Sequence, residues 1–341
     1  MNRHTNDDDI EALEYANKCL ELLIPILSGP PNEYTEELLA AVAILRLNEE
    51  MDVYDNRFHL TGTTRILNTS SFLHSSSGLG EAAAWLCLRQ EMYISLVSQQ
   101  PLQTHLEHFE HMRSLHRSDD LAWANQMILL SAKILKHAFL ERDSDVIARL
   151  QQLSGEVDRW RDTKPASFDP LRFVPPSFER RERFPVVWMV SPFHGELFSP
   201  HVSIRLFIHW SDVLMRGKVL GLQYYHLASL ILAVSTANIH ISGYQDLRDA
   251  KRTEKSVRTH LLIMVGLACS NRRAENALFL ARHALTVWGS VFRDRLDQEA
   301  VEEFLRDVEA RTGWRMVHAI DALREQWHED RLRSTWGNAA V

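Results

Sequence analysis

The chain has 341 residues, and its 45 Asp and Glu against 38 Lys and Arg give a formal charge of −7 at pH 7. Apolar residues make up 45% and charged residues 24%, which is the composition of a folded globular protein and excludes a disordered, collagen-like or disulfide-stapled chain. The negative charge also argues against a nucleic-acid surface spread over the whole chain, because phosphate binding needs clustered Lys and Arg.

The cysteines and the apolar runs limit the compartment. Three cysteines, far apart in the sequence, supply neither a local metal site nor a disulfide framework, so the chain fits the cytosol or nucleus: Cys19, Cys87 and Cys269. The acidic start, with Asp7 to Asp9, lacks the order of a secretory signal. The longest apolar runs, 227–234 and 261–269, are shorter than the roughly 18 residues that span a bilayer, so no membrane-spanning segment is expected.

Helical periodicity continues along most of the chain. Apolar residues at three- and four-residue steps predict helices over 10–27, 38–51, 60–67, 80–99, 118–139, 144–160, 218–239, 252–270, 274–291, 298–311 and 314–328. Pro25 is expected to kink or end the first helix, and Ser118 and Ser144 to cap two others. No convincing alternating strand occurs, so the predicted class is all-α, an irregular multi-helix bundle forming a single large domain.

Three segments stand apart from these helices. Residues 1–9 read as a disordered N-terminus and residues 331–341 as a tail. Residues 163–185 hold five of the eleven prolines and predict a long ordered loop. That loop could be a domain boundary, but its apolar flanks favour a crossing over the surface of one domain.

Two groups of residues suggest a metal site or the active site of an enzyme. His105, His108 and His111 lie at three-residue steps, but on a helix such steps spread the side chains around the axis, and no cysteine completes a ligand set. Asp7 to Asp9 and the pair Asp119-Asp120 suggest the carboxylates of helical metal-dependent enzymes. A frayed terminus and a capped helix start explain these carboxylates better, so neither group is assigned as a metal site.

Two groups of basic residues suggest nucleic-acid binding or nuclear import. In the proline-rich segment Arg and Lys alternate with Phe, as at Arg183 and Phe184, but acidic neighbours cancel most of the charge, and a loop held by buried phenylalanines is favoured. Arg248, Lys251, Arg252 and Lys255 could serve nuclear import, and a solvated helix face explains them equally well.

Polar residues within apolar helices are the best candidates for a binding site. They are predicted either to line an effector pocket or to form structural hydrogen bonds between helices, since buried polar groups need partners: Trp85, Arg89, Gln90, Gln223 and His226. No Walker-type loop, Gly-x-Ser-x-Gly or His-Glu-x-x-His motif occurs. No catalytic residue is therefore assigned, and a non-enzymatic function is expected.

Several blocks, taken in order, carry a family resemblance. They are ELLAAVAILRLNEEMD (37–52), GLGEAAAWLCLRQEMYISLVSQQPL (78–102), DDLAWANQMILLSAKIL (119–135), KPASFDPL (164–171), LGLQYYHLASLIL (220–232), VGLACSN (265–271) and TGW (312–314), followed by Trp327. This set resembles the fungal-specific transcription factor domain, the helical regulatory region of fungal binuclear zinc-cluster regulators. The resemblance extends from about residue 10 to 328, and residues 10–330 are taken as this regulatory-type domain.

The resemblance is incomplete in two places. Members of the family carry an N-terminal Zn2Cys6 module that holds two zinc ions, and three scattered cysteines cannot supply its six thiolates. No cofactor and no direct DNA binding are therefore expected of this polypeptide, which reads as a truncated or stand-alone form. Residues 191–218 match nothing in the family and are predicted to be an insertion, either lineage-specific or a retained intron.

The resemblance implies a regulator of RNA polymerase II transcription located in the nucleus, with the cytoplasm as the alternative. The implied partners are transcription-machinery or regulator proteins, a homo- or heterodimer with full-length relatives, and a small-molecule effector that shifts a conformational equilibrium. Two alternatives stay open at this point. One is a stand-alone helical interaction protein that modulates full-length relatives, and the other, with less support, is an α-helical enzyme.

Overall fold

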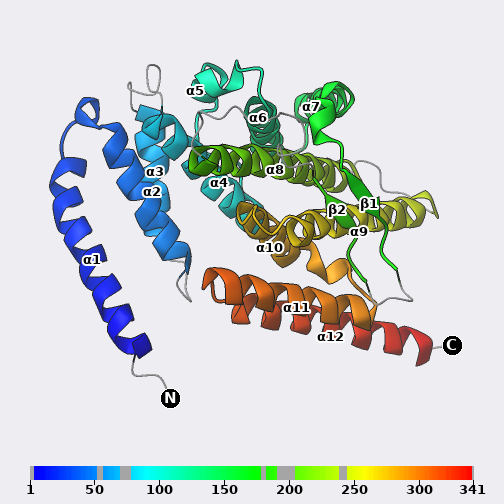
Figure 1. Ribbon diagram of the computed structural model, residues 1–341. Coiled ribbons are helices and arrows are strands. Elements are labelled where there is room, and N and C mark those ends of the chain that lie inside the picture. The colour runs from blue at the N-terminus through cyan, green and yellow to red at the C-terminus, as the bar shows by residue number, and fades with distance from the viewer. Residues whose placement is uncertain are drawn as a thin grey trace. The chain divides into compact units, whose positions relative to one another are not determined.

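Helices dominate the computed structural model, which describes residues 4–51, 57–69, 78–177, 182–189, 204–237 and 244–339 (Figure 1). The predicted all-α class is confirmed for this part of the chain. Residues 178–181 of the proline-rich segment and residues 191–203 of the predicted insertion lie outside the described residues. The chain divides into two compact units, a division that the expectation of a single domain did not include.

The first unit comprises residues 1–92 and 103–112. Its elements are α1 (His4–Leu27), the 3-10 turn η1 (Pro31–Glu33), α2 (Glu36–Met51), α3 (Phe58–Thr69), most of α4 (Leu79–Ser98) and α5 (Glu107–Glu110). Fully buried Leu39, Ile66 and Phe109 belong to its core. Glu36 fixes the start of α4, because its carboxylate accepts a 2.9 Å hydrogen bond from the backbone N–H of Gly80.

The second unit comprises residues 93–102 and 113–341. Its helical elements are η3 (Arg113–Leu115), α6 (Asp120–Ala138), α7 (Ser144–Thr163), η4 (Ala166–Phe168), α8 (Ile204–Ala237), α9 (Tyr244–Ser270), α10 (Asn276–Trp288), η6 (Gly289–Val291), α11 (Arg295–Thr312) and α12 (Val317–Ala339). Helix α8 contacts α6, α7, α9 and α10 and is central to this unit (Figure 1). Gly221 allows its close approach to α6, since a Cβ there would lie 3.2 Å from the Cα of Ala124.

The apolar character of α8 follows from this central position. Its segment Gly217–Thr236 is long and apolar enough to cross a membrane by length and composition, and it is the one such segment among the described residues. Within this apolar stretch, 61% is buried inside the protein, as in the core helix of a folded domain. Leu227, Leu230 and Ile231 are at most 2% exposed.

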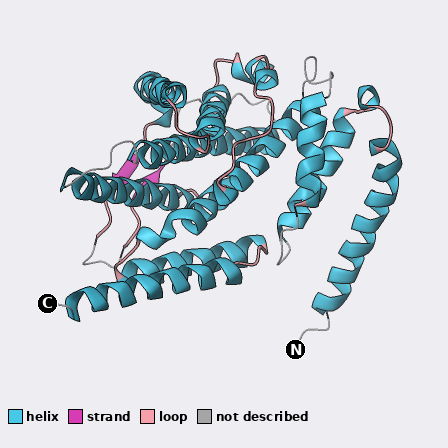
Figure 2. Cartoon of the chain, turned by 180° about the vertical axis from the view of Figure 1, so that it is seen from behind, coloured by secondary structure: helices cyan, strands magenta, loops and turns pink. Residues whose placement is uncertain are grey.

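A short antiparallel strand pair, with β1 in the proline-rich segment and β2 directly after it, corrects the expectation that the chain holds no strand. Strands β1 (Arg172–Val174) and β2 (Val186–Trp188) pair with Phe173 opposite Val187 (Figure 2). Three-residue strands are too short to show alternation in sequence. The end of α9 holds β2 in place: Asn271 donates to the carbonyl of Val187 at 2.9 Å and accepts from the N–H of Met189 at 3.1 Å.

Several helix ends differ from their predicted positions. Asp119 and Asp143, rather than Ser118 and Ser144, cap α6 and α7 by accepting backbone hydrogen bonds from Ala122 and Val146. A carboxylate competes well for this position because it also faces the positive end of the helix dipole. Helix α1 begins at His4 and contains Pro25, and helix α12 continues to Ala339 within the expected tail.

Candidate functional site

The predicted effector residues of α4 lie in the first unit. Trp85 is 5% exposed and its ring meets that of Phe109 edge-on, with the centroids 5.0 Å apart. The Gln90 side chain is buried and donates to the carbonyl of Ala43 on α2 at 3.3 Å. Arg89 is half-buried. For Gln90, the structural interpretation of a hydrogen bond between helices is confirmed.

Gln223 ties three helices of the second unit together. Its side chain is fully buried, and its Nε2 donates to the carbonyl oxygens of Met264 on α9 at 2.9 Å and Ala277 on α10 at 3.0 Å. Both protons of the amide are thereby used, at two carbonyls that helix hydrogen bonding leaves with a second lone pair. Gln223 therefore helps to specify how α8, α9 and α10 pack, because a side chain needs two donors to bridge both carbonyls.

One turn along α8, His226 meets His260 of α9. Their Nδ1 atoms are 2.8 Å apart and their rings are tilted by 51°. Burial lowers the pKa of both imidazoles, and that of His226, which also faces His260, falls to about 3. Both rings are consequently neutral near pH 7, and the short contact requires one Nδ1–H to donate to the lone pair of the other Nδ1.

The five predicted residues therefore form two sets rather than one described cluster. Trp85, Arg89 and Gln90 belong to α4 in the first unit, and Gln223 and His226 belong to α8 in the second. The contacts described above for Trp85 and Gln90 lie within the first unit, and those of Gln223 and His226 lie within the second. A shared effector pocket stays a prediction.

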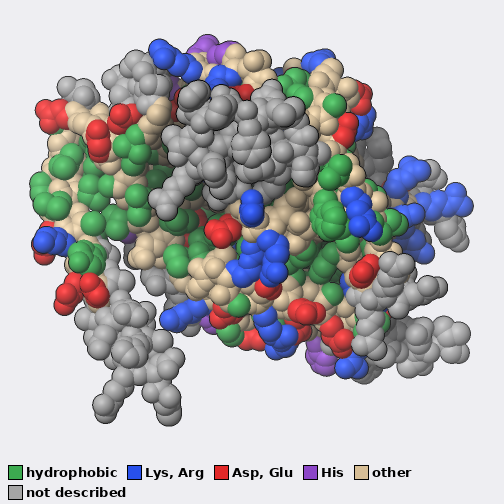
Figure 3. Space-filling view, in the orientation of Figure 1, with side chains coloured by type: hydrophobic (Ala, Val, Ile, Leu, Met, Phe, Trp, Pro, Cys, Tyr) green, Lys and Arg blue, Asp and Glu red, His purple; other side chains and the backbone are tan. Residues whose placement is uncertain are grey.

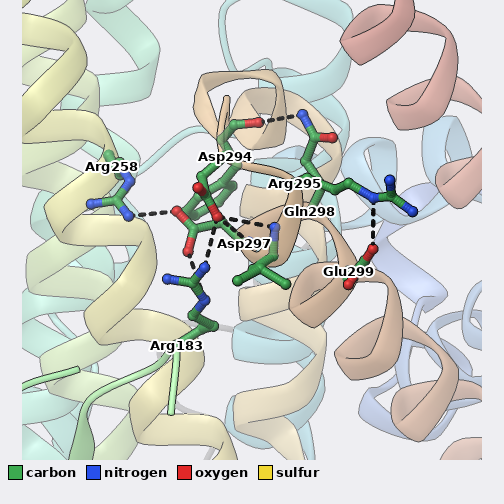
Figure 4. A network of polar contacts seen from close by, with 9 residues as sticks. Arg183, Arg258, Asp294, Arg295, Asp297, Gln298 and Glu299 are labelled. Atoms are coloured by element: carbon green, nitrogen blue, oxygen red, sulfur yellow. Dashed lines mark hydrogen bonds and ion pairs between the residues drawn. The ribbon is translucent and has the colours of Figure 1, made fainter. Parts of the chain in front are cut away.

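An ion-pair cluster that the sequence did not indicate joins the end of the hairpin segment to α9 and α11 (Figure 4). Arg183 donates to Asp294 at 2.7 Å, and Arg258 of α9 donates to Asp297 at 2.5 Å. Asp297 is 3% exposed and also lies 3.6 Å from the Arg183 Nε. Two guanidinium groups and two carboxylates balance in charge, so the cluster holds the hairpin segment, α9 and α11 together. Arg183 is engaged in these ion pairs and is not available to contact nucleic acid.

The acidic pair considered for metal chemistry also has structural partners. Asp119 caps α6 and pairs with Arg117. Asp120 lies 3.2 Å from the Lys218 Nζ and accepts from the Ser167 hydroxyl at 2.6 Å. These contacts confirm the interpretation of Asp119 as part of a capped helix start. They also show that Asp120 links α6 to α8 and η4.

The histidine run is distributed around a short helix. His105 precedes α5 and His111 follows it, and both are exposed, whereas His108 is half-buried. The described parts of the chain contain no group of three or more His, Cys, Asp or Glu arranged to hold a metal ion.

Burial raises the pKa of the Cys87 thiol to about 12, so this thiol stays protonated.

The exposed surface carries two further features. On α9 the basic side chains considered for nuclear import follow one helix face at exposed positions: Arg248, Lys251, Arg252 and Lys255. Figure 3 shows Lys and Arg gathered at that end of α9. On α1, Tyr15, Leu22, Ile24 and Ile26 are between 48% and 66% exposed, and Figure 3 shows hydrophobic side chains over this helix.

The described residues also include an open cavity of about 320 Å³ between α6 and α7. Trp123, Lys133, Arg159 and Trp160 are among the residues that line it. The sequence pattern does not single out these residues, because each one alone is ordinary for an amphipathic helix.

Comparisons of the chain with protein-family models, curated proteins and solved structures find no match.

Proposed function

We propose that this chain is the regulatory domain of a fungal transcription regulator of the zinc-cluster class, and that it acts on RNA polymerase II transcription without catalysis. The single observation that carries the proposal is the ordered set of sequence blocks that resembles the fungal-specific transcription factor domain. Those blocks coincide with core elements: block 37–52 falls on α2, block 119–135 on α6 and block 220–232 on α8.

The chemistry of the interior supports a regulatory rather than a catalytic role. The Gln223 Nε2 and the pair His226–His260 join helices, and Asp119 and Asp120 are engaged in a cap and an ion pair. Polar contacts of this kind specify one packing of helices. A ligand or partner that favours another packing would shift the equilibrium between the two states.

The proposal can be tested by tethering the chain to a heterologous DNA-binding domain and measuring transcription of a reporter in yeast. We expect the tethered chain to change transcription severalfold relative to the DNA-binding domain alone. The control is the same fusion carrying Gln223→Glu, which places a carboxylate against two carbonyl oxygens and should abolish the effect. A folded, nuclear fusion that leaves the reporter unchanged would contradict the proposal.

A second candidate, a stand-alone helical interaction protein, is favoured by α1. Its exposed apolar side chains Tyr15, Leu22 and Ile26 follow one another at steps of seven and four residues along the helix, a spacing that can present an apolar stripe to a partner. Co-purification with a full-length relative would support this candidate. A reading frame with six cysteines immediately upstream in the genome would support the transcription regulator instead.

A further inference from the structure

The cavity between α6 and α7 is a groove between one face of each helix. From α6 it is lined by Trp123, Gln126, Leu130 and Lys133, which follow one another at steps of three and four residues. From α7 it is lined by Glu156, Arg159, Trp160 and Thr163, at similar steps. Its volume of about 320 Å³ is at the lower end of the range for small-molecule sites.

Two indole rings form an aromatic corner at one part of this groove. The ring centroids of Trp123 and Trp160 are 6.5 Å apart and the ring planes meet at 59°. A hydrogen bond of 3.0 Å from the Trp160 Nε1 to the backbone carbonyl of Trp123 fixes their relative position. Trp123 is half-buried, whereas Trp160 is 6% and Leu130 8% exposed. A flat apolar ligand could therefore cover the part of the Trp123 indole that water now contacts and reach the exposed edge of Trp160.

The charged residues of the groove favour an anion. Lys133 and Arg159 contribute two positive charges, and Glu156 contributes one negative charge. The Glu156 carboxylate accepts a 2.9 Å hydrogen bond from Gln152, on its own helix. Arg159 is exposed, and its guanidinium makes no hydrogen bond or ion pair within the described parts of the chain. A guanidinium beside an aromatic wall suits a planar carboxylate, which it can bind through two parallel hydrogen bonds.

We propose that this groove binds an aromatic monocarboxylate, with its ring system in the Trp123–Trp160 corner and its carboxylate on Arg159. Trp123 and Lys133 are ten residues apart on α6, which corresponds to about 15 Å along the helix axis. A two-ring acid fits within that length. Lys133 adds long-range attraction for the anion, and Glu156 opposes it.

The position of Trp160 connects the groove with the interior of the unit. Its indole stacks on Tyr225 of α8, with centroids 5.9 Å apart and planes within 19° of parallel, and Tyr225 precedes His226. Trp160 and Tyr225 therefore connect a ligand in the groove with the contact between His226 and His260. This inference deepens the proposed function by naming an effector class, and it rests on that function for the regulatory consequence alone.

The test is calorimetric titration of the full chain with naphthalene-2-carboxylate at pH 7.5, and with naphthalene-2-carboxamide as the neutral control of the same shape. We expect saturable one-site binding of the acid, at least fivefold tighter than binding of the amide. Arg159→Gln should weaken binding of the acid about fivefold or more and leave that of the amide unchanged. Glu156→Gln should strengthen binding of the acid about twofold.

The matched control is Arg142→Gln, an exposed arginine just before α7 that does not line the groove and should leave the affinity for the acid unchanged. Equal affinities for acid and amide, an Arg159→Gln variant that binds the acid as tightly as the native chain, or no saturable binding would overturn the proposal. Failure of this proposal is distinguishable from failure of the proposed function. A chain that binds the acid but leaves reporter transcription unchanged would refute the proposed function and support the binding site.

Discussion

The half-buried pair His226–His260 predicts a specific loss of stability in mild acid. The ordinary pKa of histidine is about 6.5, and burial lowers that of His226 to about 3. As the pH falls through 6.5, the unfolded chain takes up a proton that the folded chain refuses, so stability is full above pH 6.5 and declines toward pH 3. Between pH 7.5 and 5, His226 should reduce the free energy of unfolding by about 2 kcal/mol.

The assay is urea unfolding followed by circular dichroism at pH 7.5, 6 and 5, comparing the native chain with His226→Gln. Glutamine retains a donor and an acceptor toward His260 but does not titrate. The variant should therefore lose less stability on acidification, by about 2 kcal/mol at pH 5. His328→Gln, at an exposed position of α12, is the matched control. Parallel pH profiles of the native chain and His226→Gln would refute the reasoning.

Three further substitutions test the packing, each by urea unfolding at pH 7.5. Gly266→Ala would place a methyl group against the carbonyl oxygen of Pro185 and should reduce the free energy of unfolding by about 1–3 kcal/mol. Gly155→Ala, where nothing lies within 4 Å, should be neutral or stabilise by up to about 1 kcal/mol. Equal effects of the two variants would contradict the close contact of Gly266 with Pro185. Asp297→Asn removes the buried negative charge that pairs with Arg258 and lies near Arg183, and it should cost about 1.5–3 kcal/mol. Arg295→Gln, in an exposed ion pair, should cost less than about 1 kcal/mol. Equal losses for the two variants would show that the ion-pair cluster does not stabilise the fold. Gln223→Met removes both donors to Met264 and Ala277 and should cost about 1–3 kcal/mol, and an unchanged stability would remove this residue from the helix junction.

The sequence predicted the helices well because their apolar residues recur with a helical period over many turns. Helix α6 illustrates this: expected at 118–139, it occupies Asp120–Ala138. The cap differs because both Ser118 and Asp119 can accept the backbone hydrogen bonds. The hairpin was missed since β1 and β2 are three residues long and are held by Asn271, which is distant in sequence.

The candidate site was less predictable for a related reason. Polar residues in apolar helices correctly indicated buried hydrogen bonds at Gln90 and Gln223, but periodicity does not say which carbonyl each will meet. The partner of His226 lies 34 residues away, and Arg183 meets Asp294 across 111 residues. The groove depends on how α6 and α7 are paired, which follows from tertiary packing rather than from the pattern of either helix.

The most direct measurement of the central claim is nascent transcription after rapid depletion of the tagged chain in the cells that express it. A regulatory domain acts on transcription itself, so we expect synthesis at a limited set of genes to change within minutes, before any change in metabolites. Restoring the native chain should reverse the change, and restoring the Gln223→Glu variant should not. Unchanged nascent transcription together with accumulation of a metabolite would contradict the account and indicate an enzyme.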